Sequence, residues 1–350
     1  MKIDKINLLV IMICVITSAC NNQKQVLKTT GLKMPATKQT VVETEKFKID
    51  YTLTKDQTHS KFSSKIPPVL TVKSGAIIEA YTEEASDEQI KLGDGPEVLA
   101  DIKFDPIHPL TGPVYVEGAE PGDVLKVKLL EVELQDWGWN SILPGFGFLA
   151  EDFTEPYLRT YETQSGQSHI DFTDKIKVPL KPFPGVMGVA PATGEMLSTI
   201  PPRENGGNMD DPNMVEGITV YFPVFVDGAL FSIGDAHATQ GAGEVCGTAI
   251  EAPMRFVYQI EVLKGVRSIR EPEYETDDYY AVTAFATTID EAAKKAVGFM
   301  VDYLVAEHNL NRNEAYALCS LAGDLKIAEV VDVPNMLVSM HMSKKVLGIK

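Results

Sequence analysis

The fold of this chain is organised around residues 220–247, whose sequence is VYFPVFVDGALFSIGDAHATQGAGEVCG. The first half of this stretch is mostly apolar and aromatic, a composition typical of strands that enter a hydrophobic core. From Gly234 onward, acidic residues and a histidine stand among glycines, which let a backbone turn sharply or approach a ligand closely. Asp235 and His237 are two residues apart, so on an extended segment their side chains point to the same face. The stretch therefore predicts core strands that lead into the first two ligands of a metal site.

Short segments of alternating hydrophobicity, separated by Gly and Pro, occur on both sides of this stretch. Val124–Val132 alternates clearly and follows the turn sequence Pro121-Gly122-Asp123. Further along, Ile327–Val333 has the composition of a late strand. Many short strands with such punctuation favour a β-sandwich or barrel over alternating βα units.

From Ala281 onward the hydrophobic pattern becomes helical. Thr288 and Glu291 have the spacing of a capping box, and apolar residues then recur at helical intervals. Asn311 is placed to cap a second helix that runs to about Leu321. We therefore expect an α+β, predominantly β fold, with a β-sandwich- or barrel-like core and two C-terminal helices.

Composition excludes some classes of partner. The 350 residues include 49 Asp and Glu against 32 Lys and Arg, a formal net charge of −17. A nucleic-acid-binding protein needs clustered basic residues, so no nucleic-acid partner is expected. The same charge opposes electrostatic attachment to anionic lipid. The hydrophobic fraction of 44% supports a sizeable core.

The N-terminus has the pattern of an export signal. Met1–Lys5 is short and basic, and Ile6–Ile16 is almost wholly apolar but too short for a comfortable membrane span. The small residues before Cys20 are similar to the lipobox of bacterial lipoproteins, although Thr17 stands where such boxes usually carry an aliphatic residue. We predict export to the bacterial cell envelope and membrane anchoring only through a lipid on Cys20, with simple secretion as the alternative.

Residues 21–46 are polar and poor in aromatic residues, as flexible tethers are, and alternation begins near Phe47. The sequence therefore predicts this organisation: a signal peptide over 1–19, a tether over 20–46, and a folded domain over 47–350 that is β-rich over 47–280 and α+β over 281–350.

Two further motifs are specific. Residues 201–210 have the sequence PPRENGGNMD, and residues 234–244 have the sequence GDAHATQGAGE. Together with residues 108–123, 185–191 and 311–334, they resemble the acetamidase/formamidase family over essentially everything from Phe47 onward. The resemblance implies a β-rich, metal-associated catalytic domain that hydrolyses formamide and acetamide to ammonia and the carboxylate, and that is unrelated to nitrilases or to Ser-Ser-Lys amidases.

Two positions depart from the pattern of that family. Ala242 stands where family members commonly carry Asp, and His108 stands where Asn is common. Both departures leave the candidate metal ligands intact, but Ala242 is expected to affect substrate preference or a hydrogen bond behind the site.

Amide hydrolysis gives the acidic residues plausible roles. An amide is a poor electrophile, and a bound Zn²⁺ polarises its carbonyl and lowers the pKa of a water molecule to about 7. Such a site needs about three protein ligands and an open position. Asp235, His237 and Glu251 are the first choices, with Asp210 brought in by the glycine loop. Glu244 is the expected general base.

The remaining site predictions concern the substrate and the metal. Asn208 is expected to bind the substrate amide or the oxyanion, with Gly207 and Gln240 beside it. The ligand set is rich in carboxylates, so Mn²⁺ or Ca²⁺ remain compatible alongside Zn²⁺.

Three alternatives stay open. Cys246 offers a thiolate nucleophile, although we expect Cys246 and Cys319 to be buried free thiols. A non-catalytic envelope lipoprotein that binds a ligand on the same scaffold would retain most of these features, and Ala242 is the one residue that favours it. The sequence is also compatible with a homo-oligomer.

Overall fold

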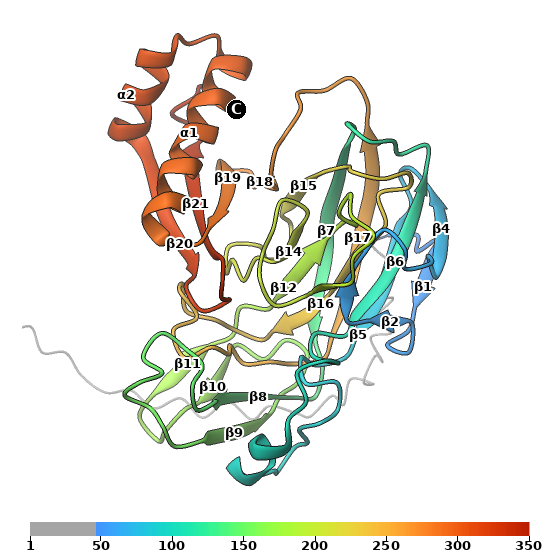
Figure 1. The fold of residues 1–350 in the computed structure, drawn as a ribbon, viewed down its shortest axis with the longest axis vertical. Coiled ribbons are helices and arrows are strands. Elements are labelled where there is room, and N and C mark those ends of the chain that lie inside the picture. Colours follow the sequence, from blue (N-terminus) through green and yellow to red (C-terminus); the bar gives the residue numbers. More distant parts are fainter. Residues whose placement is uncertain (1–46, 350) are drawn as a thin grey trace, which may run out of the picture. The chain divides into compact units, whose positions relative to one another are not determined.

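The computed structural model describes residues 47–349, whose strands form two large sheets and several short pairs (Figure 1). The larger sheet has nine strands. In spatial order these are β1 (Tyr51–Leu53), β5 (Ile77–Thr82), β17 (Met254–Leu263), β7 (Val124–Leu134), β15 (Thr219–Pro223), β18 (Glu273–Glu275), β19 (Tyr279–Ala286), β21 (Met336–Ser343) and β20 (Gly323–Glu329).

The second sheet has six strands and contains the stretch around which the sequence is organised. Its strands are β14 (Gly206–Asn208), β12 (Phe183–Gly188), β16 (Phe231–His237), β6 (Leu110–Glu117) and β2 (Thr58–His59), with β4 (Leu70–Lys73) also paired to β6. The short pairs are β8 (Trp137–Ile142) with β9 (Tyr157–Glu162), β10 (His169–Asp171) with β11 (Lys177–Pro179), and β13 (Leu197–Ser198) with β3 (Lys61–Phe62); one 3₁₀ helix, η1, covers Pro96–Asp101.

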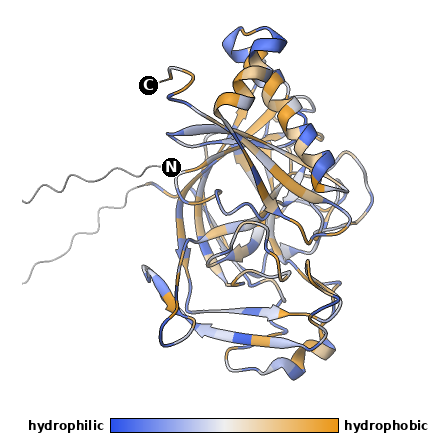
Figure 2. Ribbon diagram, turned by 90° about the vertical axis from the view of Figure 1, so that its left-hand side faces the viewer, coloured by the Kyte–Doolittle hydropathy of each residue, from blue (hydrophilic) through white to orange (hydrophobic). Residues whose placement is uncertain are grey.

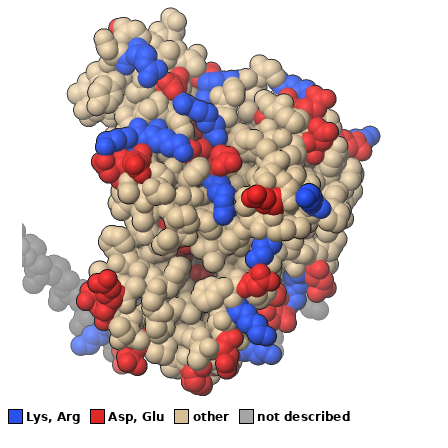
Figure 3. Space-filling view, in the orientation of Figure 1, with Lys and Arg blue, Asp and Glu red and all other residues tan. Residues whose placement is uncertain are grey.

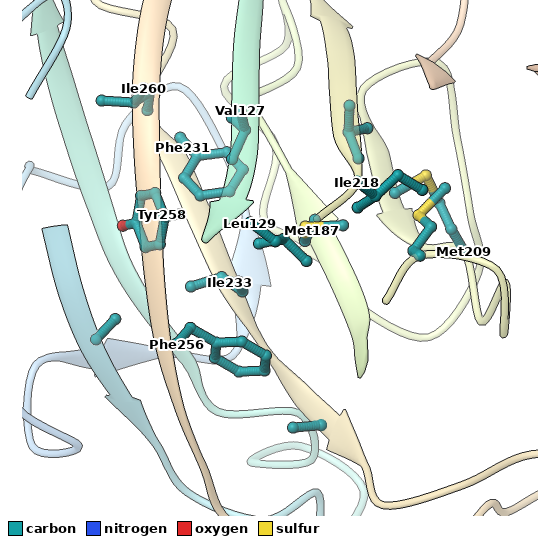
Figure 4. Close-up of a cluster of buried hydrophobic side chains, with 14 of the residues drawn as sticks. Val127, Leu129, Met187, Met209, Ile218, Phe231, Ile233, Phe256, Tyr258 and Ile260 are labelled. Carbon is teal, nitrogen blue, oxygen red and sulfur yellow. The ribbon is translucent and has the colours of Figure 1, made fainter. Parts of the chain in front are cut away.

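The hydrophobic core lies between the two large sheets. Phe231 and Ile233 of β16 face Phe256 and Tyr258 of β17, and the rings of Phe231 and Tyr258 lie 5.4 Å apart (Figure 4). These side chains are fully buried, and burying each one contributes about 1.5–3 kcal/mol to folding. The packing holds β16 rigidly, so the residues at its carboxyl end have a fixed place.

Two helices cover the C-terminal part of the nine-stranded sheet (Figure 2). Helix α1 covers Ile289–His308 and begins where the Thr288 side chain accepts a hydrogen bond from the Glu291 backbone. Helix α2 covers Arg312–Ala322 and has a complete capping box between Asn311 and Glu314. The residues of α1 that pack on β19 and β21 are Ala292, Ala296, Met300 and Leu304.

These observations confirm the predicted fold class, which is predominantly β with few helices. One predicted strand is misplaced: β20 covers Gly323–Glu329, so it begins before Ile327 and ends before Val333. The Glu329 carboxylate accepts hydrogen bonds from the backbones of Val331 and Asp332, which turns the chain away from the sheet. Cys319 is buried as expected, but the prediction for Cys246 is wrong, because its free thiol belongs to a partly exposed residue.

The predicted signal peptide, the lipidation site Cys20 and the tether all lie outside the described residues. Within residues 47–349, no helix combines the length and the apolar character that crossing a bilayer would require.

Candidate active site

His237, the last residue of β16, is surrounded by carboxylates. Its Nε2 atom lies 3.1 Å from Glu251 Oε2, 3.7 Å from Asp210 Oδ1 and 3.7 Å from Asp235 Oδ1. All four side chains are almost completely buried. The structure therefore brings together the four residues that the sequence proposed as metal ligands.

The carboxylate oxygens that face His237 have no hydrogen-bond partner. Asp210 Oδ1, Asp235 Oδ1 and Glu251 Oε2 are each buried and unpartnered, whereas the second oxygen of Glu251 accepts a hydrogen bond from the Ala249 backbone at 2.7 Å. A buried polar atom without a partner is costly, so these three oxygens indicate a missing ligand.

The spacing of these atoms suits a metal ion. Two tetrahedral ligands at about 2.1 Å from zinc lie about 3.4 Å apart, close to the 3.1–3.7 Å found around His237. In the described part of the chain, two groups of possible ligands meet here: Asp235, His237 and Glu251, and Asp210, His237 and Glu244. Both groups share one imidazole, so they favour a single ion.

Gln240 holds the imidazole from behind. Its Oε1 atom lies 2.8 Å from His237 Nδ1, and its Nε2 atom donates to the Asp210 backbone carbonyl at 2.7 Å. Both polar ends of Gln240 are thus engaged and it does not line the cavity described below, so its binding of substrate stays a prediction that these contacts do not support. It orients Nε2 of His237 toward the carboxylates, as residues behind metal ligands commonly do.

The backbone around the site is strained. Asp210, Asp235 and Glu244 all have left-handed φ angles, of 39°, 46° and 44°. Non-glycine residues rarely adopt this conformation, and such residues gather at functional sites. Asp235 does approach His237 as expected, but through this turned backbone and not through regular strand alternation.

Glycine at position 185 permits the close approach of these elements. A Cβ atom there would lie 2.4 Å from Asp210 Oδ1 and 2.7 Å from the Cε1 atom of His237. In the sequence, Gly185 stands out only as part of a motif, and nothing there indicates this role. Gly207, which it expected to bind substrate, has a φ angle of 85° and does not line the cavity described below.

A second acidic group adjoins the ligand cluster. Asn208 donates from Nδ2 to Asp332 Oδ2 at 2.9 Å, while its Oδ1 atom is buried without a partner. Burial and the nearby Asp210 raise the pKa of Asp332 well above its usual value, and burial raises the pKa of Glu329 to about 8. Asp332 and Glu329 were not predicted as site residues, although acidic residues inside an apolar run were an available signal.

The carboxylates also influence each other and His237. Burial by itself lowers the pKa of His237, but the charges of Glu251, Asp235 and Asp210 raise it well above its usual value. Burial, together with Asp210, raises the pKa of Glu244 well above its usual value. Burial raises the pKa of Glu251 to about 7. This many buried acids with so little positive charge call for a cation or for bound protons.

A cavity of about 60 Å³ opens onto this cluster. In Figure 3, acidic atoms lie at the bottom of a hollow near the end of β16, surrounded by uncharged surface. The polar residues that line the cavity include Asn208, Asp210, Asp235, His237, Glu244, Glu251 and Asp332.

His108 adds a second histidine to the cavity. Its Nε2 atom lies 3.6 Å from Asp235 Oδ2, and its buried Nδ1 atom has no partner. From the sequence, His108 was only a departure from the family pattern and had no predicted role. Its left-handed φ of 58° and its backbone hydrogen bond to Ala85 place it opposite Asp235.

Comparison with known proteins identifies the family. The model of the Acetamidase/Formamidase family matches residues 46–198 and 192–348. The chain belongs to the acetamidase/formamidase family. Among its relatives, an acetamidase of Mycolicibacterium smegmatis is 29% identical over 59% of this chain and 66% of that protein, so the match spans about two thirds of the relative. A formamidase of Methylophilus methylotrophus is 28% identical over 68% of this chain and 74% of that protein.

Solved structures agree with the family. An acetamidase from Bacillus halodurans superposes with a TM-score of 0.80 at 31% identity, covering 85% of this chain and 98% of that one. A gamma lactamase from Delftia acidovorans superposes with a TM-score of 0.60 at 26% identity, covering 85% and 93%. The family membership confirms the prediction of an amidohydrolase.

Proposed function

We propose that this chain hydrolyses small linear amides, such as formamide and acetamide, to the carboxylate and ammonia in a metal-dependent reaction. The observation that carries the proposal is the set of unpartnered carboxylate oxygens that converge on His237 at the closed end of a small cavity. Names of relatives, acetamidase and formamidase, support the substrate class.

Asp210, Asp235, His237 and Glu251 are the residues that would hold the ion. When bound, a divalent ion supplies a Lewis acid that polarises the amide carbonyl and makes water a nucleophile near neutral pH. We favour zinc because a histidine nitrogen with carboxylate oxygens suits it, while the number of carboxylates also suits Mn²⁺ or Ca²⁺.

Glu244 is the proposed general base, and it lines the cavity beside Asp210 and His237. Burial and Asp210 raise the pKa of Glu244, and a cation held beside it would oppose that rise and favour the carboxylate. This carboxylate takes a proton from the attacking water as the oxygen bonds to the carbonyl carbon. When the carbon–nitrogen bond breaks, the same carboxyl group returns the proton to the departing nitrogen, which leaves as ammonia.

Asn208 is the proposed substrate-binding residue. Its amide nitrogen is engaged by Asp332, so its unpartnered Oδ1 atom is the group available to the substrate. A carbonyl oxygen accepts hydrogen bonds, which favours a contact with the amide N–H of the substrate over stabilisation of an oxyanion.

The cavity size supports small substrates. Its 60 Å³ is well below the roughly 150 Å³ of an engineered cavity that holds benzene. On that scale the enclosed space suits a molecule of a few non-hydrogen atoms, as formamide and acetamide are.

The test is ammonia release from formamide, acetamide and propionamide by purified protein, before and after chelation and with added Zn²⁺, Mn²⁺ or Ca²⁺. We expect turnover that chelation abolishes and one of the ions restores. Activity that survives complete removal of metal would refute metal dependence, and no release with any ion would favour the non-catalytic binding lipoprotein.

We also propose, from the sequence of residues 1–46, that the protein acts in the bacterial cell envelope, anchored through a lipid on Cys20. Cys20→Ala should move the protein from the membrane fraction to the soluble exported fraction, or leave the precursor uncleaved, with unchanged specific activity. Wild-type protein found in the cytoplasm with Met1 retained would contradict this.

A further inference from the structure

The cavity has two unlike sides. One side consists of the carboxylates and His237, and the other is apolar. Among the described residues that line the cavity, none is Lys or Arg. The apolar side includes Trp139 and the residues Ile90, Leu99, Ile102, Leu143 and Phe146.

Trp139 ties the apolar side to the ligand cluster. Its backbone forms two hydrogen bonds with Glu251: the Trp139 nitrogen donates at 2.9 Å, and the Glu251 nitrogen donates back at 2.7 Å. The indole of Trp139 is 5% exposed and lines the cavity. A change in the position of this strand therefore moves the apolar wall and a ligand together.

The indole is fixed by a buried carboxylate that has no other evident task. Trp139 Nε1 donates to Glu84 Oε2 at 2.6 Å. Glu84 is completely buried and also accepts from the Ser86 backbone at 2.8 Å, the Ser86 hydroxyl at 2.7 Å and the Glu88 backbone at 2.8 Å. Within residues 47–349 no cation pairs with Glu84, so four neutral donors alone offset its burial.

Burying a carboxylate costs free energy of desolvation, so its use to hold one indole indicates that the orientation of that indole matters. An apolar group could fill the same space without desolvating a charge. The four donors fix Glu84, and Glu84 fixes the angle of the ring at the wall of the cavity.

From this geometry we propose that the acyl group of the substrate packs against Trp139 and that Glu84 is the residue that positions this wall. The site then selects neutral primary amides with a compact apolar acyl group. Acyl groups that carry a carboxylate are disfavoured, because the side of the cavity where the acyl group packs is apolar, no Lys or Arg lines it, and several acids stand opposite. This inference rests on the proposed amidase function.

The first test compares two amides of equal size. Propionamide and glycolamide differ by a terminal methyl against a hydroxyl, and a hydroxyl buried without a partner costs enough for a preference of about tenfold or more. We expect kcat/KM to favour propionamide by that factor. Equal values, a preference for glycolamide, or hydrolysis of acetamide with no hydrolysis of either would overturn the inference.

The second test changes the wall and its support. Trp139→Leu and Glu84→Leu should each raise KM for propionamide and reduce its advantage over glycolamide, with a smaller effect on kcat for formamide. Glu84→Gln keeps an oxygen that accepts from the indole, but its NH2 group replaces the oxygen that accepts from the Ser86 hydroxyl and the Glu88 backbone, so it should retain most of the preference. If Glu84→Leu fails to fold, Trp139→Leu and Glu84→Gln still decide the question.

A matched control separates positioning from stability. Glu271 is another buried acid; it accepts from the Phe285 backbone, pairs with Lys295 and does not line the cavity. Glu271→Leu should lower the melting temperature without changing the propionamide preference. A preference that falls equally in Glu271→Leu and Glu84→Leu would show that Glu84 is only structural.

Tryptophan emission gives an independent readout, since the chain has only two tryptophans. In a Trp137→Phe background, emission reports on Trp139 alone. Glu84→Leu should change it and Glu84→Gln should change it less; equal spectra would overturn the positioning role. If the amidase proposal fails, the protein releases no ammonia from any amide. If only the proposal about Trp139 and Glu84 fails, the protein releases ammonia but shows no preference between the acyl groups.

Discussion

Asp210 and Asp211 are neighbours in the chain, and both are buried, but they belong to two different polar clusters. Asp210 Oδ1 faces His237 and has no hydrogen-bond partner. Asp211 accepts from Asn213 with one oxygen and from the Tyr274 hydroxyl, at 2.6 Å, with the other. The Asp210 carboxylate is therefore open, in the sense that one oxygen has no hydrogen-bond partner, whereas the Asp211 carboxylate is closed because both of its oxygens accept hydrogen bonds.

The histidines of the two clusters differ in the same way. His341 Nε2 lies 2.8 Å from the Tyr274 hydroxyl and 2.9 Å from the Ser339 hydroxyl, so hydroxyl groups close the side of this cluster that faces Asp211, while the buried Nδ1 atom of His341 has no partner. Burial lowers the pKa of His341 to about 4, while nearby carboxylates raise that of His237. A closed polar cluster holds the fold together, whereas an open one leaves its atoms for a ligand.

The largest expected effect comes from replacing each histidine. His237→Ala should remove the bound metal and lower kcat/KM by about 10³-fold or more, the scale seen when a catalytic group is lost. His341→Ala should keep metal and activity but lower the free energy of unfolding by about 1–3 kcal/mol. Metal content by elemental analysis, initial rates and urea unfolding measure these effects. Stoichiometric metal in His237→Ala would remove the ligand assignment.

The neighbouring aspartates sharpen the comparison further. Asp210→Asn should lower kcat/KM by about 10²-fold or more, and the metal-free protein should be no less stable, because one buried like charge is removed. Asp211→Asn should do the reverse: a loss of about 1–3 kcal/mol in stability, with most of the activity kept. A large loss of stability in metal-free Asp210→Asn would show that its carboxylate is not open.

In the metal-free protein, the contributions of the two clusters to the free energy of unfolding should change with pH in opposite directions. The folded state holds protons on Glu251 up to about pH 7 and on Glu329 up to about pH 8, well above the usual range of an unfolded glutamate. The native state then binds more protons than the unfolded state. The contribution of each of these groups to the free energy of unfolding therefore falls as pH rises from about 4.5 to its folded pKa. His341 titrates near pH 4 when folded, below its usual value of 6.5, so its contribution rises between about pH 4 and 6.5.

Urea unfolding between pH 5 and 8 in chelator measures the sum of these contributions. Above pH 6.5 the contribution of His341 is complete, and the groups whose pKa values are raised, His237 and the buried carboxyl groups, each lose stabilisation on the order of 1 kcal/mol per pH unit, so stability should fall. Added metal should reverse the fall, and Glu329→Gln should flatten it. Stability that rises between pH 6.5 and 8 without metal would contradict the assigned pKa directions.

The sequence predicts what depends on local pattern. Alternation and capping residues such as Thr288 and Asn311 specify strands and helices without reference to distant parts of the chain. The ligand residues were found because they stand in two dense motifs. What the sequence did not predict arises from contacts between distant segments: Asp332 meets Asn208 across 124 positions, and Glu84 meets Trp139 across 55.

Side-chain direction is likewise beyond a reading of local pattern. Gln240 was assigned to the substrate because it stands among ligand residues, and the structure places its side chain against the imidazole of His237. The left-handed backbone at Asp235 and Glu244 cannot be inferred from residue type, since only glycine adopts it readily.

The smallest expected effect concerns Cys246, which stands in the central motif and offers the competing thiolate mechanism. Its Sγ atom donates to the Thr248 carbonyl at 3.4 Å and accepts from Asn140 Nδ2 at 3.6 Å. Gly247 and Thr248 line the cavity but Cys246 does not, so the lining of the cavity favours water over its sulfur as the nucleophile. Cys246→Ala should therefore change kcat/KM by no more than a few-fold, through the loss of two weak hydrogen bonds beside the site.

Thr248→Val is the matched control, because Thr248 carries the hydroxyl that binds Asn140 and the Ser141 backbone. A loss of about 10³-fold in Cys246→Ala, with metal still bound, would transfer the nucleophile from water to the thiolate and make the open carboxylate cluster a means of activating that sulfur.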